Sequence, residues 1–341
     1  MMTALNPVQG AAPGAARALE AQSGGVLATR MFGWVNLAVM AAYLINTYLT
    51  FWLGLPGTTG LLAGGTTVAA QAQAALYLLL PLLAVALVLR SRTVTLRNDS
   101  DRVSGLNTFL IRWAFWAVVI VGFVDGTISF LRVEGMLEGL FGPQLAADLG
   151  RAQFRGPYVH MPLIGLSILI AAFTRTLGFH WLGLLVVVSE LLIVLGRFVF
   201  SYEQAFLADL VRFWYAAAFL FASAYTLIEE GHVRVDVLYA NFGQSWKGFF
   251  NAFGTIFFGL TFCWTILVVG LATRQSIIVS PMLAYETTQA GFGMYVKYLM
   301  AGFLGVFAVS MMIQFVSYLF AAVADMRGDE GGRDLSGVIQ H

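Results

Sequence analysis

Long apolar runs separated by short polar breaks constrain this chain more than any other feature. A segment needs about 20 mostly apolar residues to cross a bilayer as a helix, and a helix satisfies its own backbone hydrogen bonds in lipid. The runs lie at residues 31–54, 73–89, 109–131, 158–173, 181–200, 211–228, 249–271 and 294–323. The sequence therefore predicts an all-α fold, a polytopic membrane helix bundle of about eight transmembrane helices.

Composition agrees with this prediction and removes several functional classes. The chain is 59% hydrophobic and 11% charged, whereas roughly a quarter of the residues of a soluble domain are charged. A net charge of +1 with 19 Lys and Arg argues against a nucleic-acid partner, because phosphate recognition needs clustered cations. The single cysteine, Cys263, lies inside an apolar run, so neither an intramolecular disulfide nor a cysteine metal cluster is expected. We expect no cofactor and no metal.

Arginines in the loops predict the orientation, since cytoplasmic loops collect Lys and Arg. The loop at 90–102 holds four arginines, whereas the loop at 55–71 holds no charge. This contrast places the N-terminus in the cytoplasm, and an even number of spans returns the C-terminus there. Residues 1–30 and 327–341 are then expected to be flexible cytoplasmic tails.

Two loops are less clear in this topology. The loop at 132–157 should be periplasmic, yet it contains Arg132, Arg151 and Arg155. Its amphipathic part predicts a surface helix outside the bilayer. The polar break at 175–180 is short, which leaves open whether the fourth and fifth runs are separate spans or one re-entrant hairpin.

Asp125 lies inside the third run, where an unpaired charge costs several kcal/mol. Gly122 and Gly126 flank it and would let another helix approach closely. Asp125 is either a carrier of protons or cations or a hydrogen-bonded packing site. We favour the packing site, because no second acid lies nearby in that run.

The fifth run contains Glu190 and Arg197, which are seven residues apart and share one helix face. Their separation of about 10 Å along the axis is too long for a direct bond. Each is therefore expected to pair with a neighbouring helix, and Arg212, close to Asp209, is a candidate partner. We favour an ion-pair seam inside the bundle over an ion pathway.

The densest polar cluster follows the sixth run, in the sequence EEGHVRVDV. Gly231 can end the helix in a left-handed conformation. His232, Arg234 and Asp236 then alternate with valines, which places the polar groups on one side if the stretch is extended.

The segment HVRVDVLY at 232–239 resembles the signature of the small permease subunit of TRAP transporters, the DctQ type, in the loop between its second and third helices. The Glu190 run, the segment GRFVF at 196–200, and Asp209 with Arg212 resemble the family's first helix and the start of its second. Lys297 resembles the entry into the fourth helix, although Tyr295 and Val296 replace the usual Trp-Pro. The resemblance covers residues 180–326 approximately.

The resemblance implies a division into an N-terminal four-helix extension at 31–176 and a DctQ-like four-helix domain at 177–326. It also implies a scaffold subunit in the bacterial inner membrane, supporting sodium-driven uptake of a carboxylate-type solute. The implied partners are a large permease subunit of the DctM type and a periplasmic substrate-binding protein of the DctP type. Glu190, Arg197, Asp209 and Arg212 would then serve bundle or subunit contacts, and His232, Arg234 and Asp236 would fix the cytoplasmic connection.

Two other functions fit the sequence less well. A haem-binding redox subunit would need paired histidines, but His160 and His180 are expected about a bilayer apart. A self-sufficient secondary transporter would need broken helices or paired polar groups at membrane depth, and only Pro81, Pro162 and Asp125 offer such features. No nucleophile and base pair up for an enzyme.

Overall fold

The computed structural model describes residues 24–62, 64, 67–175, 178–202, 204–228, 239–287 and 293–331, and these residues contain helices but no strand. Eight helices among them are long and apolar enough to span a membrane. They are α2 (Gly24–Phe51), α4 (Val68–Arg90), α5 (Leu96–Val133), the continuous α7, η1 and α8 (Ala152–Phe173), α9 (Phe179–Val199), α10 (Ala205–Ile228), the continuous α11, η3 and α12 (Gln244–Leu271) and α14 (Lys297–Arg327). The predicted eight-span bundle is confirmed, and α8 and α9 are separate helices.

Shorter helices connect the spans. They are α3 (Thr59–Leu62), α6 (Leu137–Leu149), η2 (Tyr239–Asn241) and α13 (Val279–Ala284). Two of the spans are composite. The first consists of α7 (Ala152–Arg155), η1 (Gly156–His160) and α8 (Met161–Phe173), and the second of α11 (Gln244–Gly254), η3 (Thr255–Leu260) and α12 (Thr261–Leu271). Helix α6 is the predicted helix of the 132–157 loop. It is kinked at Gly142, whose φ is 79°, immediately before Pro143.

Local sequence signals explain where several spans begin and end. Thr67 and Thr95 cap α4 and α5, and each hydroxyl accepts a hydrogen bond from the amide three residues later, as an N-cap does. Helix α14 ends at Arg327 and is capped by Gly328, whose φ is 76°. A glycine adopts this left-handed conformation at little steric cost.

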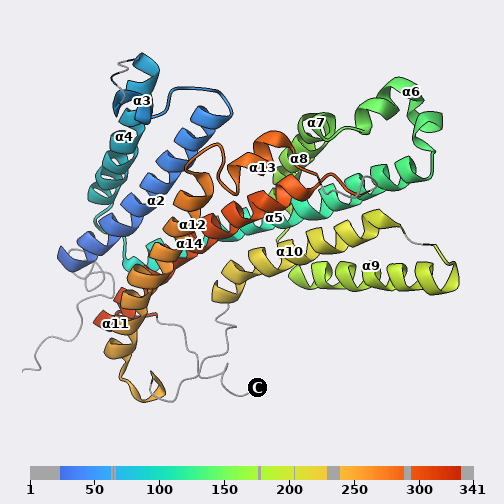
Figure 1. Cartoon of the computed structure of the whole chain (residues 1–341). Helices are drawn as coiled ribbons and strands as arrows, with labels where there is room; N and C mark the ends of the chain where they lie inside the picture. The colour runs from blue at the N-terminus through green and yellow to red at the C-terminus, as the bar shows by residue number, and fades with distance from the viewer. Residues whose placement is uncertain are drawn as a thin grey trace, which may run out of the picture.

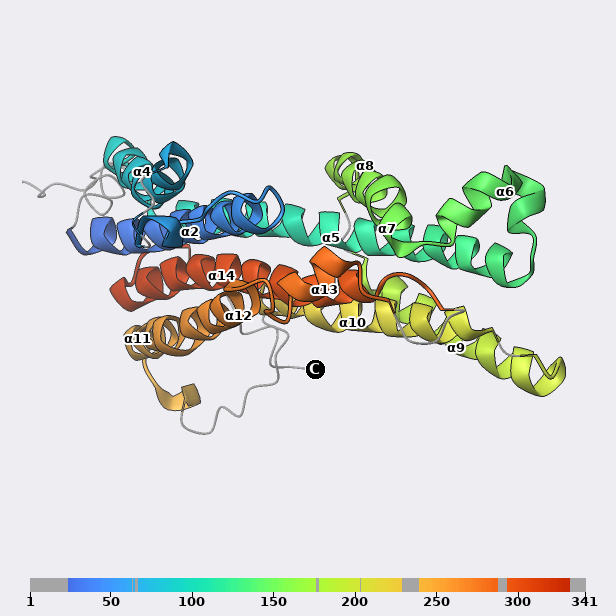
Figure 2. The ribbon, with the colours of Figure 1, turned by 45° about the horizontal axis from the view of Figure 1, so that its top comes forward.

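Helices α5 and α14 run side by side through the molecule and pack against most of the other spans (Figures 1 and 2). Helices α2 and α12 pack around one part of α14, and α10 packs between the other parts of α5 and α14. Because α5 precedes residue 177 and α14 follows it, the two halves of the chain share one packed core.

One end of this bundle collects the start of α2, the end of α4, the start of α5 and the end of α14; we call it the Arg30 end. Arg30 Nε lies 2.7 Å from Asp99 Oδ2, and both side chains are at most 2% exposed. Arg97 Nη2 lies 2.7 Å from Asp325 Oδ1. The predicted even number of spans is thereby reflected in the structure, because α2 begins at the end where α14 terminates.

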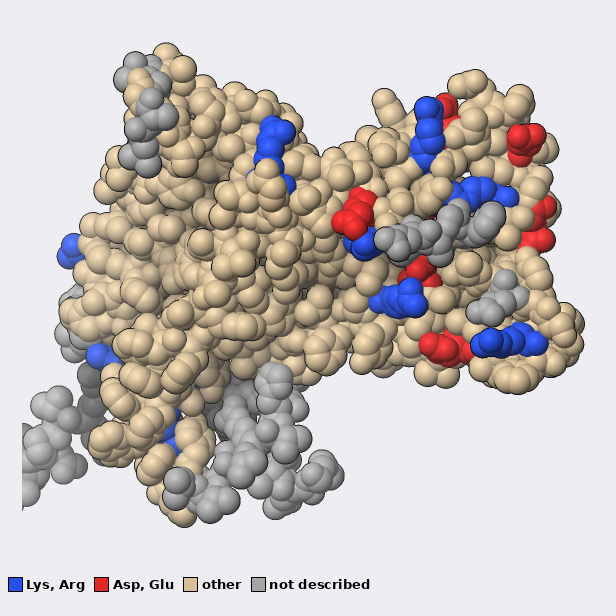
Figure 3. Space-filling model, viewed as in Figure 1, with Lys and Arg blue, Asp and Glu red and all other residues tan. Residues whose placement is uncertain are grey.

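Charged side chains avoid the middle of the face seen in Figure 3, which is covered by uncharged residues. Lys, Arg, Asp and Glu gather instead at the end of the molecule that carries α6, α9 and the start of α14. This second charged end is far from the Arg30 end along α5 and contains the polar site described next.

Candidate functional site

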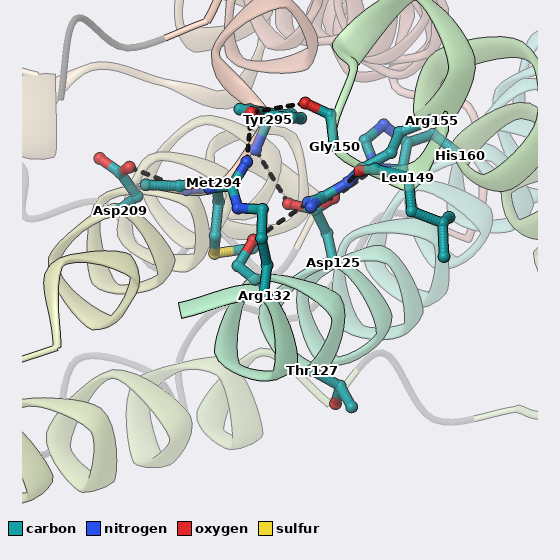
Figure 4. Close-up of polar contacts among 12 residues, drawn as sticks. Asp125, Thr127, Arg132, Leu149, Gly150, Arg155, His160, Asp209, Met294 and Tyr295 are labelled. Atoms are coloured by element: carbon teal, nitrogen blue, oxygen red, sulfur yellow. Dashed lines mark hydrogen bonds and ion pairs between the residues drawn. The ribbon is translucent and has the colours of Figure 1, made fainter. Parts of the chain in front are cut away.

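Asp125 lies in the last third of α5 and is completely buried. Its Oδ1 atom lies 2.8 Å from Nη1 of Arg155, whose side chain is also 0% exposed. Arg155 comes from α7, and its Nη1 further contacts Ser129 Oγ at 3.0 Å while its Nε donates to the Leu149 carbonyl. A buried carboxylate is stable in such a place only when it is paired and hydrogen-bonded. We call Asp125, Arg155, His160, Tyr295 and Tyr298 the Asp125 cluster, and Figure 4 labels the first four of these residues.

His160 is the second partner of Asp125. It ends the π-helix η1, and its Nε2 lies 3.0 Å from Asp125 Oδ1. A carboxylate only accepts hydrogen bonds, so Nε2 carries a proton. Nδ1 of the ring lies 2.8 Å from the Tyr298 hydroxyl on α14, which can donate to a neutral imidazole. The opposite charges of Asp125 and Arg155 balance each other.

Tyr295, just before α14, connects the cluster to the second half of the chain. Its amide donates to Asp125 Oδ2 at 2.9 Å, and its hydroxyl donates to the Gly150 carbonyl at 2.9 Å. The guanidinium carbons of Arg132 and Arg155 lie 4.6 and 4.4 Å from the centre of its ring, at cation–π distance. Arg132 also donates to the Tyr295 hydroxyl and to the Gly293 carbonyl. Figure 4 shows these groups converging from separate segments.

The arginines of the 132–157 loop therefore have specific partners. Arg155 belongs to the Asp125 cluster and Arg132 donates to Tyr295 in it, while Arg151 pairs with Asp148. The Arg155 side chain is fully buried, whereas the Arg151 side chain is 64% exposed.

A second contact joins the halves near the same end. Tyr202, in the turn between α9 and α10, donates its hydroxyl proton to Glu134 at the end of α5, and Gln204 Nε2 donates to the same carboxylate oxygen at 3.1 Å. The bond to the carboxylate raises the pKa of Tyr202. Gly156 also lies against the ring of Tyr285, so that a Cβ there would be 2.1 Å from the ring. The end of α5 and the 134–160 segment are thus fixed to the second half at several points.

The residues predicted to form a seam divide into two groups. Asp209 is buried on α10; its Oδ2 accepts from the Met294 amide at 3.1 Å, and its Oδ1 lies 3.5 Å from Arg212, whose side chain is 69% exposed. Lys297 pairs with Glu286, and both side chains are 44% exposed. Asp209 and Lys297 therefore hold the segment that leads into α14.

Glu190 and Arg197 require a correction. Both are exposed on α9, and α9 packs on α10 through its other face, which buries Leu182 and Ser189. They do share a face, as their spacing predicts, but that face points outward and does not meet Arg212. This face is exposed because α9 lies at the edge of the bundle (Figures 1 and 2), a position that depends on tertiary packing. His232, Arg234 and Asp236 lie outside the described residues.

Sequence reasoning singled out Asp125 but missed Arg155 and His160 as its partners. The positions of Asp125 and His160 along their spans could have indicated that they meet. Asp125 lies eight residues before the end of α5 at Val133, and His160 lies eight residues after the start of the next span at Ala152. Consecutive spans run in opposite directions, so the two side chains come to similar depth. Gly122 was correctly linked to close packing, since a Cβ there would be 2.3 Å from Trp214 Nε1 on α10.

The Asp125 cluster has the features of a fixed anchor. Both carboxylate oxygens and both ring nitrogens already have protein partners, although Arg155 Nη2 has none among the described residues. In the same part of the chain, no group of three or more His, Cys, Asp or Glu is placed to hold a metal ion. The geometry joins α5, η1 and α14 and leaves these atoms no free face for cargo.

Comparison with known proteins gives one family match. Residues 185–325 match the model of the family described as "Tripartite ATP-independent periplasmic transporters, DctQ component". No curated protein and no solved structure gives a significant match to the chain. The matched region begins within α9 and ends within α14, so it contains the last four spans. The chain therefore carries a DctQ domain, that of the small permease of TRAP transporters, at residues 185–325, preceded by an N-terminal helical extension consistent with a long form of this component.

Proposed function

We propose that this chain is the small scaffold subunit of a complete tripartite transporter in a bacterial inner membrane. In this proposal a large permease subunit of the DctM type carries the solute and sodium sites, and a periplasmic protein of the DctP type delivers a carboxylate-type solute. The observation that carries the proposal is the DctQ match across the last four spans. The chain's own charges support it, because the Asp125 cluster is a fixed anchor without room for cargo.

The outward face of α9 supports the proposed contact with the large subunit. Glu190 lies about midway along an apolar helix and is exposed among leucines and valines. A carboxylate at membrane depth is costly unless it faces protein or water. A neighbouring subunit that covers this face and offers a donor or a cation would remove that cost.

The extension has a proposed role of its own. Helices α6, α7 and η1 are fixed through the Asp125 cluster to the segment that leads into α14. This arrangement would give the DctQ domain a larger rigid surface on the side where a periplasmic binding protein docks. The assignment of that side rests on the predicted orientation, in which the arginine-rich loop at 90–102 is cytoplasmic.

Affinity purification of the tagged chain from its native membrane, followed by mass spectrometry, tests the proposal. We expect recovery of a larger multi-span permease. Reconstituted alone in proteoliposomes, the chain should move no solute under a sodium gradient. A chain that purifies alone and still transports solute would show that it is a self-sufficient transporter.

A further inference from the structure

A polar cavity of about 590 Å³ opens at the Arg30 end. It lies between the start of α5, one face of α11 and the last turns of α14, and its wall is mostly polar, with Ser100, Asn251, Gln314 and Ser317 among the lining residues. Cavities of 300 to 1,000 Å³ are large enough for a small ligand. The cavity shares no residue with the Asp125 cluster and has no role in the function proposed above.

The charges around this cavity do not all pair with one another. Arg97 pairs with Asp325, and Asp329 pairs with Arg327. Three charged groups of the wall then remain without an ion pair among the described residues: one cation, Lys247, and two acids, Asp101 and Glu330. Lys247 lies over the ring of Tyr239 at 5.5 Å. A ligand that carries both a negative and a positive group would complement such a wall.

An apolar groove of about 730 Å³ runs along the adjacent surface between the α11–η3–α12 helix and α14. It is lined mainly by aromatic rings, among them Phe250, Phe257, Phe258, Phe262 and Phe315. From Phe250 to Thr265 the groove follows the helix for about 22 Å, given a rise of 1.5 Å per residue. One leaflet of the hydrocarbon core is about 15 Å thick, so the groove is long enough for an acyl chain.

The polar cavity and the apolar groove meet at Asn251 and Tyr318, which line both. One end of the combined site is charged and lies at a helix terminus, and the other is apolar and lies on a membrane span. A charged surface at the helix terminus followed by an apolar surface along the span complements an amphiphile oriented like a bilayer lipid, with its headgroup at the terminus and its acyl chain along the helix. We propose that the site binds a phospholipid whose headgroup carries a phosphate and a primary ammonium, with the phosphate at Lys247, the ammonium toward Asp101 and Glu330, and an acyl chain in the groove.

Lipid retention by the purified full chain tests this proposal. The chain in mild detergent is mixed with equal amounts of phosphatidylethanolamine, phosphatidylcholine and phosphatidylglycerol, separated from free lipid, and measured by native mass spectrometry. We expect phosphatidylethanolamine to be retained about tenfold over the others. Phosphatidylcholine lacks an N–H donor for the acids, and phosphatidylglycerol lacks the cation.

Two variants with matched controls locate the site. Lys247→Gln removes the phosphate contact, and Thr265→Trp fills the groove from an exposed position whose hydroxyl bonds only its own helix. Each should lower phosphatidylethanolamine retention about tenfold. Arg90→Gln removes an exposed cation at the same end outside the cavity. Thr127→Trp places the same ring at an equally exposed threonine of α5. Neither control should change retention.

Three results would overturn the proposal. The first is equal retention of the three lipids, and the second is retention that survives both Lys247→Gln and Thr265→Trp. The third is a Thr265→Trp variant that retains lipid but no longer recovers a permease partner, because the groove would then be a protein interface. The proposed scaffold function does not depend on any of these results.

Discussion

The Asp125 cluster and the outer face of α9 both place ionisable groups inside apolar helices, but they treat them in opposite ways. Asp125 and Arg155 are 0% exposed and lie 2.8 Å apart, whereas Glu190 is exposed on α9, whose main contact is with α10. A charge in a membrane protein needs a partner in either place. The difference teaches that this chain itself supplies the partners of Asp125, whereas the exposed Glu190 carboxylate is suited to the proposed contact with another subunit.

The largest expected effect comes from breaking the buried pair. Arg155→Met leaves Asp125 buried without its cation, and removal of one partner of such a pair costs about 3–5 kcal/mol. We expect a loss of that size in the free energy of unfolding, measured by SDS titration with tryptophan fluorescence. Arg151→Met, which removes a 64%-exposed partner of Asp148, should cost less than about 1 kcal/mol.

The double variant Asp125→Asn with Arg155→Met checks the cause. It removes both charges, so more than half of the stability lost in Arg155→Met should return. If the double variant is as unstable as the single one, lost packing and not an unpaired charge is responsible.

A smaller effect is expected at the contact of α5 with α10, which joins the extension to the DctQ domain. Gly122→Ala places a methyl group 2.3 Å from Trp214 Nε1, and such overpacking costs about 1–3 kcal/mol. Gly126→Ala is the matched control, because its nearest neighbours lie 3.9 Å away. The same unfolding assay should show it neutral or more stable, as alanine favours helix by up to about 1 kcal/mol.

Glu190→Lys tests the proposed role of the outer face of α9. The chain's own stability should change by less than about 0.5 kcal/mol, as at other surface positions. Recovery of the large subunit during affinity purification should fall about tenfold, which corresponds to a loss of ~1.4 kcal/mol in the free energy of binding. Glu138→Lys, an exposed acid on α6, should leave recovery unchanged. Unchanged recovery with Glu190→Lys would exclude this face of α9 from the subunit contact.

The smallest effect is expected from Tyr295→Phe. It removes one hydroxyl that donates to Gly150 and accepts from Arg132, and keeps the ring between the two guanidinium groups. A net loss of about 0.5–1.5 kcal/mol is expected. A loss as large as that of Arg155→Met would mean that the hydroxyl, and not the buried ion pair, holds the two halves together.

Much of the fold follows from local properties of the sequence. Each apolar run of sufficient length lies largely within one spanning helix, although α5 begins at Leu96, well before the predicted start at residue 109. The agreement arises because lipid forces every spanning segment to satisfy its backbone internally. The glycine pair beside Asp125 correctly indicated close helix packing, although only Gly122 is in tight contact. These features depend on neighbouring residues along one helix, so the residue pattern of that segment is enough to predict them.

The partners across helices did not follow in the same way. Glu190 and Arg197 were expected inside the bundle, and α9 instead turned them outward. Spacing within one helix fixes which residues share a face, but it does not determine which neighbour, if any, that face meets. Arg155 was counted only as an unfavourable loop charge, because nothing local marks it as the partner of an aspartate 30 residues earlier.

The sequence by itself determined that this protein is a membrane helix bundle of eight spans with a DctQ domain in its second half. Length and hydrophobicity decide those properties within each segment, and the family pattern lies in contiguous residues. Only the tertiary structure decided that α5 of the extension lies beside α14 of the DctQ domain and that Asp125, Arg155, His160 and Tyr298 meet. Such contacts depend on how helices pack side by side, and in lipid that packing rests on shape and on pairing of polar groups between helices.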